Sequence, residues 1–150
     1  MVLDFRGEGL LSVLDLKPYV VKPNREELGQ TFGRSLDDDA DLLAAMRQLN
    51  RLGAQWVVVT QGSKAVWVSS SEQAYRLTPP RIDEVVNPIG CGDCLAAGIA
   101  WATRGGDAII DAVRLGIGAA GDNLRTLLPS RLEEENVAEL AEKVEVQEIV

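Results

Sequence analysis

The residues best suited to chemistry lie in the segment 87–93, N-P-I-G-C-G-D, which leads into an apolar helical run at 94–102. Such a turn leaves backbone N–H groups unpaired at a helix N-terminus, where they and the helix dipole favour an anion. Gly90 and Gly92 let the backbone approach that anion because neither has a Cβ. Asp93 would repel a phosphate unless it takes a proton from a hydroxyl that attacks phosphorus. The segment therefore predicts phosphoryl transfer, with an ordinary helix-capping role for Asp93 as the alternative.

The chain has no histidine and only two cysteines, Cys91 and Cys94. Histidine-based triads and imidazole metal sites are therefore excluded, and acid–base chemistry must use carboxylates or lysines. A redox or zinc pair is the alternative for the cysteines, but there is no second pair and Cys94 is expected to begin a helix. We interpret both as reduced thiols of a cytoplasmic protein.

Composition limits the classes of partner. The 150 residues are enough for one domain with a core, and the net charge of −8 argues against a nucleic-acid partner. No apolar run approaches the length of a membrane span, and Asp4 and Arg6 interrupt the apolar start that a secretory leader needs. We expect neither nucleic acid nor membrane as a partner.

Hydrophobic periodicity predicts alternating strands and helices. Strands are expected at 2–5, 19–22, 56–60, 65–68, 74–78 and 144–146. Helices are expected at 8–16, 25–30, from Asp37 or Asp38 to 52, over 94–102, after a cap at Asp107, and at 133–143. The continuous apolar run 56–60 is typical of a strand buried on both faces, and 61–64 is typical of a hairpin turn. This order predicts an α/β layered fold with a mostly parallel central sheet.

Two acidic runs, 37–39 and 133–135, have two interpretations. Carboxylates suit the positive end of the helix dipole, so we interpret the runs as helix starts. A metal site in either run is the alternative.

Three motifs in order resemble the ribokinase-like (PfkB) carbohydrate kinases. Residues 22–27, K-P-N-R-E-E, resemble the family's K-P-N-x-x-E signature, residues 60–62 its T-x-G nucleotide turn, and residues 87–93 its Gly-x-Gly-Asp signature. Asn123 matches an asparagine that many members place near the nucleotide base. The form N-P-x-G-x-G-D is most similar to the branch of 1-phosphofructokinase and tagatose-6-phosphate kinase.

The resemblance implies a catalytic role for the turn. Asp93 would be the general base on the acceptor hydroxyl. The backbone N–H groups of Gly90, Cys91 and Gly92 would form the anion hole for the transferring phosphoryl group. Their contribution would be electrostatic, because phosphoryl transfer needs positioning and charge stabilisation more than covalent help.

The resemblance also implies ATP and Mg²⁺ as cofactors. Lys22 would meet nucleotide phosphates as a point charge. Asn24 and Glu27 would position Mg²⁺, through waters that the ion gives up reluctantly. The nucleotide cleft would be lined by Thr60, Gly62 and Asn123.

Each of these residues also has a structural interpretation. Asn24 and Glu27 fit a helix cap with its acidic partner three residues later. Lys22 could be a solvated lysine after a strand, and Thr60 an edge residue with a satisfied hydroxyl. Asn123 could be an ordinary residue at a helix C-terminus.

Two residues depart from the family pattern. Cys91 stands where the family usually has Ala or Ser, and a thiol at a helix N-terminus tends toward thiolate. The hypothesis is that it would repel phosphate or make the site sensitive to oxidation. Ala65 replaces a glycine that often follows the T-x-G turn.

The resemblance covers the C-terminal half of a family member, so residues 1–150 are expected to form a single half-domain without the lid and the N-terminal strands. An interrupted sheet exposes an apolar edge, which favours a homodimer or pairing with a complementary N-terminal kinase half. The implied activity is ATP-dependent phosphorylation of a sugar phosphate such as fructose 1-phosphate or tagatose 6-phosphate. The alternative is a non-catalytic nucleotide-binding or structural fragment of a truncated or split kinase.

Overall fold

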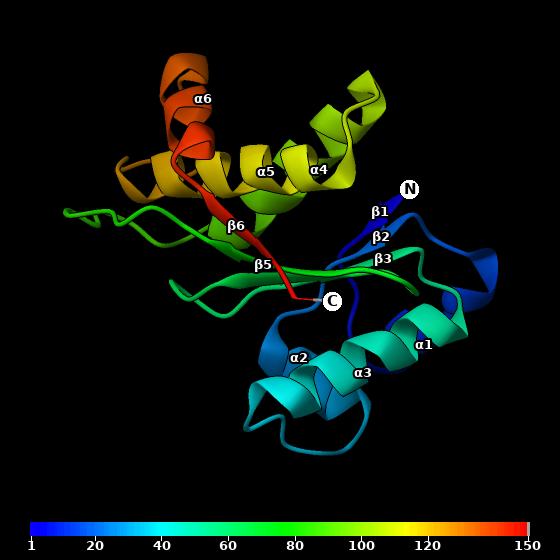
Figure 1. Cartoon of the computed structure of the whole chain (residues 1–150). Coiled ribbons are helices and arrows are strands. Elements are labelled where there is room, and N and C mark those ends of the chain that lie inside the picture. Colours follow the sequence, from blue (N-terminus) through cyan, green and yellow to red (C-terminus); the bar gives the residue numbers. More distant parts are fainter. Residues whose placement is uncertain (150) are drawn as a thin grey trace. The chain divides into compact units, whose positions relative to one another are not determined.

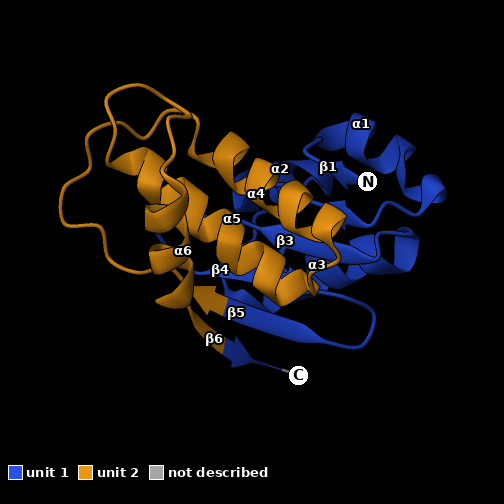
Figure 2. Cartoon of the chain, turned by 90° about the horizontal axis from the view of Figure 1, so that it is seen from above, with its two compact units in different colours: residues 1–76, 147–150 blue, residues 77–146 orange. Residues whose placement is uncertain are grey.

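The structure is a computed structural model and describes residues 1–149 (Figure 1). Its contacts divide the chain into two compact units, which Figure 2 shows in different colours. Unit 1 contains residues 1–76 and the C-terminal residues from 147, and unit 2 contains residues 77–146. None of the helices formed within residues 1–149 has the length and apolar character needed to span a membrane.

A six-stranded sheet runs in the order β1-β2-β3-β4-β5-β6. Its strands are β1 (Val2–Leu3), β2 (Val20–Val21), β3 (Trp56–Val59), β4 (Val66–Ser69), β5 (Ala74–Thr78) and β6 (Glu145–Glu148). β1, β2 and β3 pair in parallel, and β4 pairs antiparallel with β3 because the turn at 61–64 reverses the chain. The predicted α/β fold with a largely parallel sheet is therefore confirmed, with the parallel run in the first three strands.

Unit 1 has three α-helices and one 3₁₀ turn. They are α1 (Gly7–Ser12), the 3₁₀ turn Leu14–Leu16, α2 (Arg25–Thr31) and α3 (Asp39–Leu52). α3 begins where the Asp38 side chain accepts a hydrogen bond from the Asp41 N–H at 2.7 Å. It ends at Gly53, whose φ of +133° suits a residue without a side chain.

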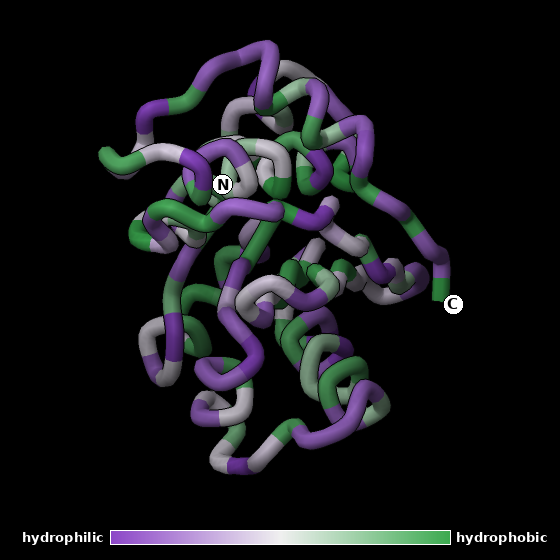
Figure 3. Tube along the Cα trace, turned by 90° about the vertical axis from the view of Figure 1, so that its left-hand side faces the viewer, coloured by the Kyte–Doolittle hydropathy of each residue, from purple (hydrophilic) through white to green (hydrophobic). Residues whose placement is uncertain are grey.

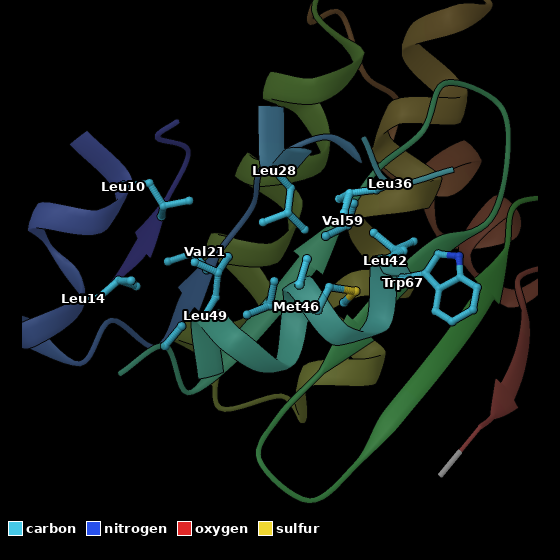
Figure 4. Close-up of a cluster of buried hydrophobic side chains, with 13 residues drawn as sticks. Leu10, Leu14, Val21, Leu28, Leu36, Leu42, Met46, Leu49, Val59 and Trp67 are labelled. Carbon is cyan, nitrogen blue, oxygen red and sulfur yellow. The ribbon is translucent and has the colours of Figure 1, made fainter. Parts of the chain in front are cut away.

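The core of unit 1 lies between these helices and one face of the sheet (Figure 4). α3 contributes Leu42, Ala45, Met46 and Leu49, a spacing that places them on one side of the helix. Successive residues of β3 point to opposite faces, and all of Val57–Val59 are at most 1% exposed. The prediction that this strand is buried on both faces is confirmed. Hydrophobic stretches are interspersed with hydrophilic ones along the trace (Figure 3), as expected for elements that pack one side into a core.

Unit 2 is built on the helices α4 (Cys91–Gly105), α5 (Ile109–Leu124) and α6 (Glu134–Glu142). α4 and α5 approach at glycines. A Cβ added at Gly98 would lie 2.7 Å from the Cα of Gly116, and one added at Gly116 would lie 2.6 Å from the backbone oxygen of Leu95. The two backbones are therefore in direct contact, and glycine is the residue that permits this.

Several predicted element bounds differ from the structure. The strand expected at 2–5 is only Val2–Leu3, because the exposed Asp4 and Phe5 lie beyond it, and the strand expected at 144–146 is Glu145–Glu148. The helix expected at 8–16 is α1 followed by the 3₁₀ turn, and the chain leaves it through Lys17 at φ +50°, directly before Pro18. The helix expected from Cys94 already begins at Cys91. Asp107 does not cap α5, which is preceded by Ala108. The Asp107 N–H instead bonds to Ala102 O at 3.1 Å, closing the C-terminus of α4 behind the left-handed Gly106.

The expectation of a single half-domain stays a prediction. The division into two units reflects where contacts between residues are concentrated, whereas a domain is a part of the chain that can fold independently.

Candidate active site

The turn before α4 lies in unit 2 and presents an uncapped helix N-terminus. Gly90 immediately precedes the helix at φ +83°, a conformation that favours glycine, and no side chain within residues 1–149 caps this end. The N–H groups of Gly92 and Asp93 belong to the first helical turn, which has no intrahelical acceptors for them. The N–H of Cys91 makes only a long bond of 3.5 Å to Pro88 O. N–H groups without acceptors at a helix N-terminus suit an anion, and the anion hole expected from Gly90, Cys91 and Gly92 stays a prediction.

Asp93 is exposed in the first turn of α4. Its carboxylate can therefore meet a hydroxyl from solvent, which a general base requires. A second acid of unit 2, Asp122, is 2% exposed and accepts a hydrogen bond from the Glu133 N–H at 2.8 Å, which is a structural use. Only the first of these two carboxylates is placed to act on an external group.

Asn87 shapes the turn, a role that the sequence analysis did not assign. Its Oδ1 accepts a hydrogen bond from the Ile89 N–H at 3.0 Å, and its Nδ2 donates to Leu127 O at 3.0 Å. The first bond is the local side-chain-to-backbone contact by which asparagine forms turns. The sequence signal was the Asn-Pro pair itself, which favours a turn start.

Asn123 lies on α5 with a fully buried side chain. Its Nδ2 donates to Ile89 O at 2.8 Å and to the Cys91 sulfur at 3.2 Å, and its Oδ1 accepts from the Ser130 N–H at 2.7 Å. The carboxamide therefore fixes the turn before α4 through its bonds to Ile89 and Cys91. The interpretation of Asn123 as an ordinary residue at a helix C-terminus does not account for these bonds. Its expected contact with a nucleotide stays a prediction.

The two cysteines are free thiols. Cys91 is half-buried and its Sγ contacts Ala120 O at 3.6 Å. Burial raises the pKa of the Cys94 thiol, and its contact with the Ser130 hydroxyl at 3.8 Å opposes that rise. Within the described part of the chain no three His, Cys, Asp or Glu side chains gather as a metal site, including the two acidic runs.

Lys22 lies at the end of β2 in unit 1. It is 4% exposed, and its Nζ is 3.0 Å from Asp4 Oδ2. The interpretation of Lys22 as a solvated lysine is therefore wrong, because the side chain is buried and ion-paired. Asp4 was missed as its partner. The two residues come directly after the parallel pair β1 and β2, whose register of Leu3 opposite Val21 places them side by side.

Asn24 and Glu27 form a capping box at the start of α2. Asn24 Oδ1 accepts from the Glu27 N–H at 2.8 Å, and Glu27 Oε2 accepts from the Asn24 N–H at 3.0 Å. The second oxygen, Oε1, is 3.6 Å from Arg6 Nη1. The structural interpretation of this pair is thus confirmed, and a role toward Mg²⁺ stays a prediction.

The residues present fit Mg²⁺ in one way. Glu27 is a single part-exposed carboxylate whose oxygens keep unused lone pairs, and residues 1–149 supply no cluster of three ligating side chains around it. Mg²⁺ commonly keeps most of its waters and takes one or two carboxylates together with substrate phosphates. Glu27 and Asn24 fit that mode, acting through waters.

Thr60 and Gly62 follow β3, and Thr60 forms an isolated parallel bridge with Asn24. Gly62 has φ +54° and open space around it. Asn24, Thr60 and Gly62 all line one open cavity of about 940 Å³ in unit 1. A smaller cavity of about 400 Å³ is lined by Asp4, Arg6 and Glu27.

The predicted site residues fall into two groups. Unit 1 contains Lys22, Asn24, Glu27, Thr60 and Gly62. Unit 2 contains Gly90, Cys91, Gly92, Asp93 and Asn123.

Solved structures share this fold. A candidate phosphofructokinase from Staphylococcus aureus matches with a TM-score of 0.87 and 26% identity, over 99% of this chain and 47% of its own. Phosphofructokinase-2 from Escherichia coli, in complex with substrates and products, matches with a TM-score of 0.82 and 24% identity, over 94% and 46%. Arabidopsis thaliana ribokinase, complexed with ribose and ATP, matches with a TM-score of 0.75 and 22% identity, over 82% and 40%.

The chain thus spans about half the length of these structures. Its match to the sequence model of pfkB family carbohydrate kinases extends over residues 4–128 and includes all three motifs. The finer expectation of a 1-phosphofructokinase or tagatose-6-phosphate kinase branch stays a prediction. With most of its length matched, the chain belongs to the pfkB family of carbohydrate kinases.

Proposed function

We propose that this chain carries the phosphoryl-transfer site of an ATP- and Mg²⁺-dependent carbohydrate kinase that phosphorylates a hydroxyl of a sugar phosphate. Fructose 1-phosphate and tagatose 6-phosphate are the proposed acceptors. The observation that carries the proposal is the uncapped first turn of α4, with Asp93 exposed beside it. Membership of the pfkB family supports the class of reaction.

The proposed mechanism divides the work between the turn and its carboxylate. The N–H groups of the first turn stabilise charge on the transferring phosphoryl oxygens. Asp93 accepts the proton of the attacking hydroxyl as the new oxygen–phosphorus bond forms and the bond to the leaving nucleotide oxygen breaks. The base needs no histidine, in keeping with a chain that has none.

Unit 1 supplies the residues proposed to meet the nucleotide. Lys22 is proposed to pair with phosphate oxygens through its ammonium, and Thr60 and Gly62 are proposed to line the nucleotide cleft. The contact of Asn123, which lies in unit 2, with the nucleotide is a separate part of the proposal. Mg²⁺, when bound, neutralises phosphate charge, with Asn24 and Glu27 orienting its waters. Support for ATP comes from the ribokinase neighbour, which was solved with ribose and ATP.

The proposed setting is the cytoplasm, with a homodimer or a complementary N-terminal kinase half completing the acceptor site. Support for assembly comes from Escherichia coli phosphofructokinase-2, for which a tetrameric inhibited form is known. Sedimentation of the purified chain measures its own assembly.

ADP release with Mg-ATP and each sugar phosphate tests the proposal, with an Asp93→Asn variant in parallel. We expect sugar-dependent release that falls by about 10²–10⁴-fold in the variant, the usual contribution of a general base. Asp111→Asn is the matched control, because it removes an equal charge from the first turn of α5. It should retain full activity.

The same assay decides the alternative. If the unaltered chain released ADP at the same rate with and without sugar phosphate, and no faster than Asp93→Asn, the kinase proposal would be overturned. ATP binding without any release would then leave a non-catalytic nucleotide-binding fragment.

A further inference from the structure

Arg25 begins α2, directly after the capping Asn24, and its side chain is only 13% exposed. Its Nε donates to Leu36 O at 2.7 Å, and its Nη2 donates to Asp38 O, also at 2.7 Å. Both carbonyls belong to the segment that leads into α3. One planar guanidinium therefore fixes the entry to the next helix through two short bonds.

The third edge of the guanidinium faces the loop after β3. Arg25 Nη1 donates to Gln61 Oε1 at 3.1 Å and to Asp39 Oδ1 at 3.3 Å. The backbone N–H of Arg25 also donates to Thr60 O at 2.9 Å. Arg25 thus holds the loop 60–62 by main chain and side chain at once.

We propose that Arg25 is a positioning residue of the nucleotide site, which holds the loop 60–62 in one conformation against the start of α2. The inference rests on the proposed function for the identity of the loop's ligand. It adds a residue that acts through Gln61 and Thr60 and that lines the same open cavity as they do. The K-P-N-x-x-E and T-x-G motifs are thereby joined by a side chain that neither motif specifies.

The loop needs such a restraint. Gly62 has φ +54°, and a Cβ added there would meet no described atom within 4 Å, so the loop borders open space at that position. The open cavity of about 940 Å³ beside it leaves room for the loop to move. A lysine cannot replace the guanidinium, because an ammonium is a point charge without the planar fork that reaches both residues 36–39 and Gln61.

The test compares the full-length chain with Arg25→Met, Arg25→Lys and Gln61→Leu. Arg47→Met is the matched control, because Arg47 is also partly buried, donates to one backbone carbonyl, that of Ser70, and lies outside both motifs. Hydrogen exchange of the amides 60–64, Mg-ATP affinity by calorimetry and the midpoint of urea unfolding are measured for each. The exchange readout needs no activity.

We expect both Arg25 variants to exchange the amides 60–64 about tenfold faster and to bind Mg-ATP about tenfold more weakly, as for the loss of one charge-assisted hydrogen bond. Gln61→Leu should show part of both effects. Arg47→Met should show neither, although its unfolding midpoint falls. Should Arg25→Met not fold, Arg25→Lys and Gln61→Leu still decide the question.

Three results would count against the inference in different ways. If the unaltered chain binds no Mg-ATP, the proposed function fails and the nucleotide role of Arg25 fails with it. If the unaltered chain binds but the Arg25 variants match Arg47→Met in exchange and affinity, the inference alone is overturned. If Arg25→Lys restores both readouts, charge rather than the fork holds the loop, and the positioning account is wrong.

Discussion

Glu27 is the residue at which a structural and a catalytic role can be separated. Its Oε2 completes the capping box of α2, and the proposed function gives the same carboxylate a role toward Mg²⁺. A glutamine keeps an oxygen that can accept the Asn24 N–H but loses the charge that a magnesium shell needs. We expect Glu27→Gln to keep the free energy of unfolding within about 0.5 kcal/mol and to weaken the Mg²⁺ dependence of ATP binding.

Calorimetric titration of ATP with and without Mg²⁺ measures this effect. The control is Asn24→Ala, which removes the cap and should lower the free energy of unfolding by about 1 kcal/mol. Equal Mg²⁺ dependence in Glu27→Gln and the unaltered chain would leave Glu27 as a helix cap alone.

Cys94 predicts a pH dependence of stability. Its burial raises the thiol pKa from the ordinary 9.0, so folding favours the protonated form. Below pH 9.0 both states hold the proton and this contribution is fully present. As the pH rises further the unfolded chain loses its proton first, and stability falls until the folded thiol also ionises.

The measurement is urea unfolding of the unaltered chain and of Cys94→Ala from neutral pH to above pH 9.0. The unaltered chain should lose more stability than the variant across the alkaline range. Tyrosines and lysines titrate in both proteins, so only the difference between the two curves is used. Parallel curves would show that burial of this thiol does not bear on stability.

At the scale of elements, the crossing of α4 and α5 depends on missing side chains. A methyl group at Gly98 would meet the backbone of Gly116, which cannot give way as a flexible side chain can. We expect Gly98→Ala to lower the free energy of unfolding by about 1–3 kcal/mol, the range for overpacking. Gly105, in the same helix with open space around it, is the control.

Gly105→Ala should be neutral or stabilising by up to about 1 kcal/mol, because alanine is the better helix former. Urea unfolding followed by circular dichroism measures both variants. If the two substitutions changed the free energy of unfolding equally, the close packing of α4 against α5 at Gly98 would be contradicted.

Elements with local signals were the ones that the sequence could predict. β5 has its predicted bounds because Pro79-Pro80 closes it, and α3 has its cap at Asp38 and its end at Gly53. The prediction of a cap at Asp107 was wrong, although aspartate is a common N-cap residue. The left-handed Gly106 turns the chain so that the Asp107 N–H bonds to Ala102 O of the preceding helix.

The candidate site shows the same difference between local signals and long-range contacts. The glycines and the acid of the turn were readable from their order along the chain. The contacts of Lys22 with Asp4, and of Asn123 with Ile89 and Ser130, were not, because they depend on strand register and on loops far apart in sequence.

At the scale of the whole molecule, the two compact units share strands. β5 and β6 each have residues on both sides of the boundary. Neither unit can therefore unfold without taking part of a strand that also belongs to the other. We expect a single cooperative transition, as in most small domains.

Two probes test this expectation in a Trp101→Phe variant. The remaining tryptophans, Trp56 and Trp67, both lie in unit 1, so their fluorescence reports on that unit. Far-ultraviolet circular dichroism reports on all helices, of which α4 and α5 are the longest. The midpoints should coincide, and separated midpoints would contradict a single half-domain.

The buried carboxamide of Asn123 has a consequence for the entropy of ligand capture. It ties Ile89 on one loop to Ser130 on another, so the two loops lose their independent motion when the chain folds. An anion that reaches the turn before α4 meets loops whose disorder folding has already removed. Binding the anion therefore costs less conformational entropy, because the loops need not become ordered on binding. The turn should bind an anion more tightly than the same N–H groups would on a free peptide.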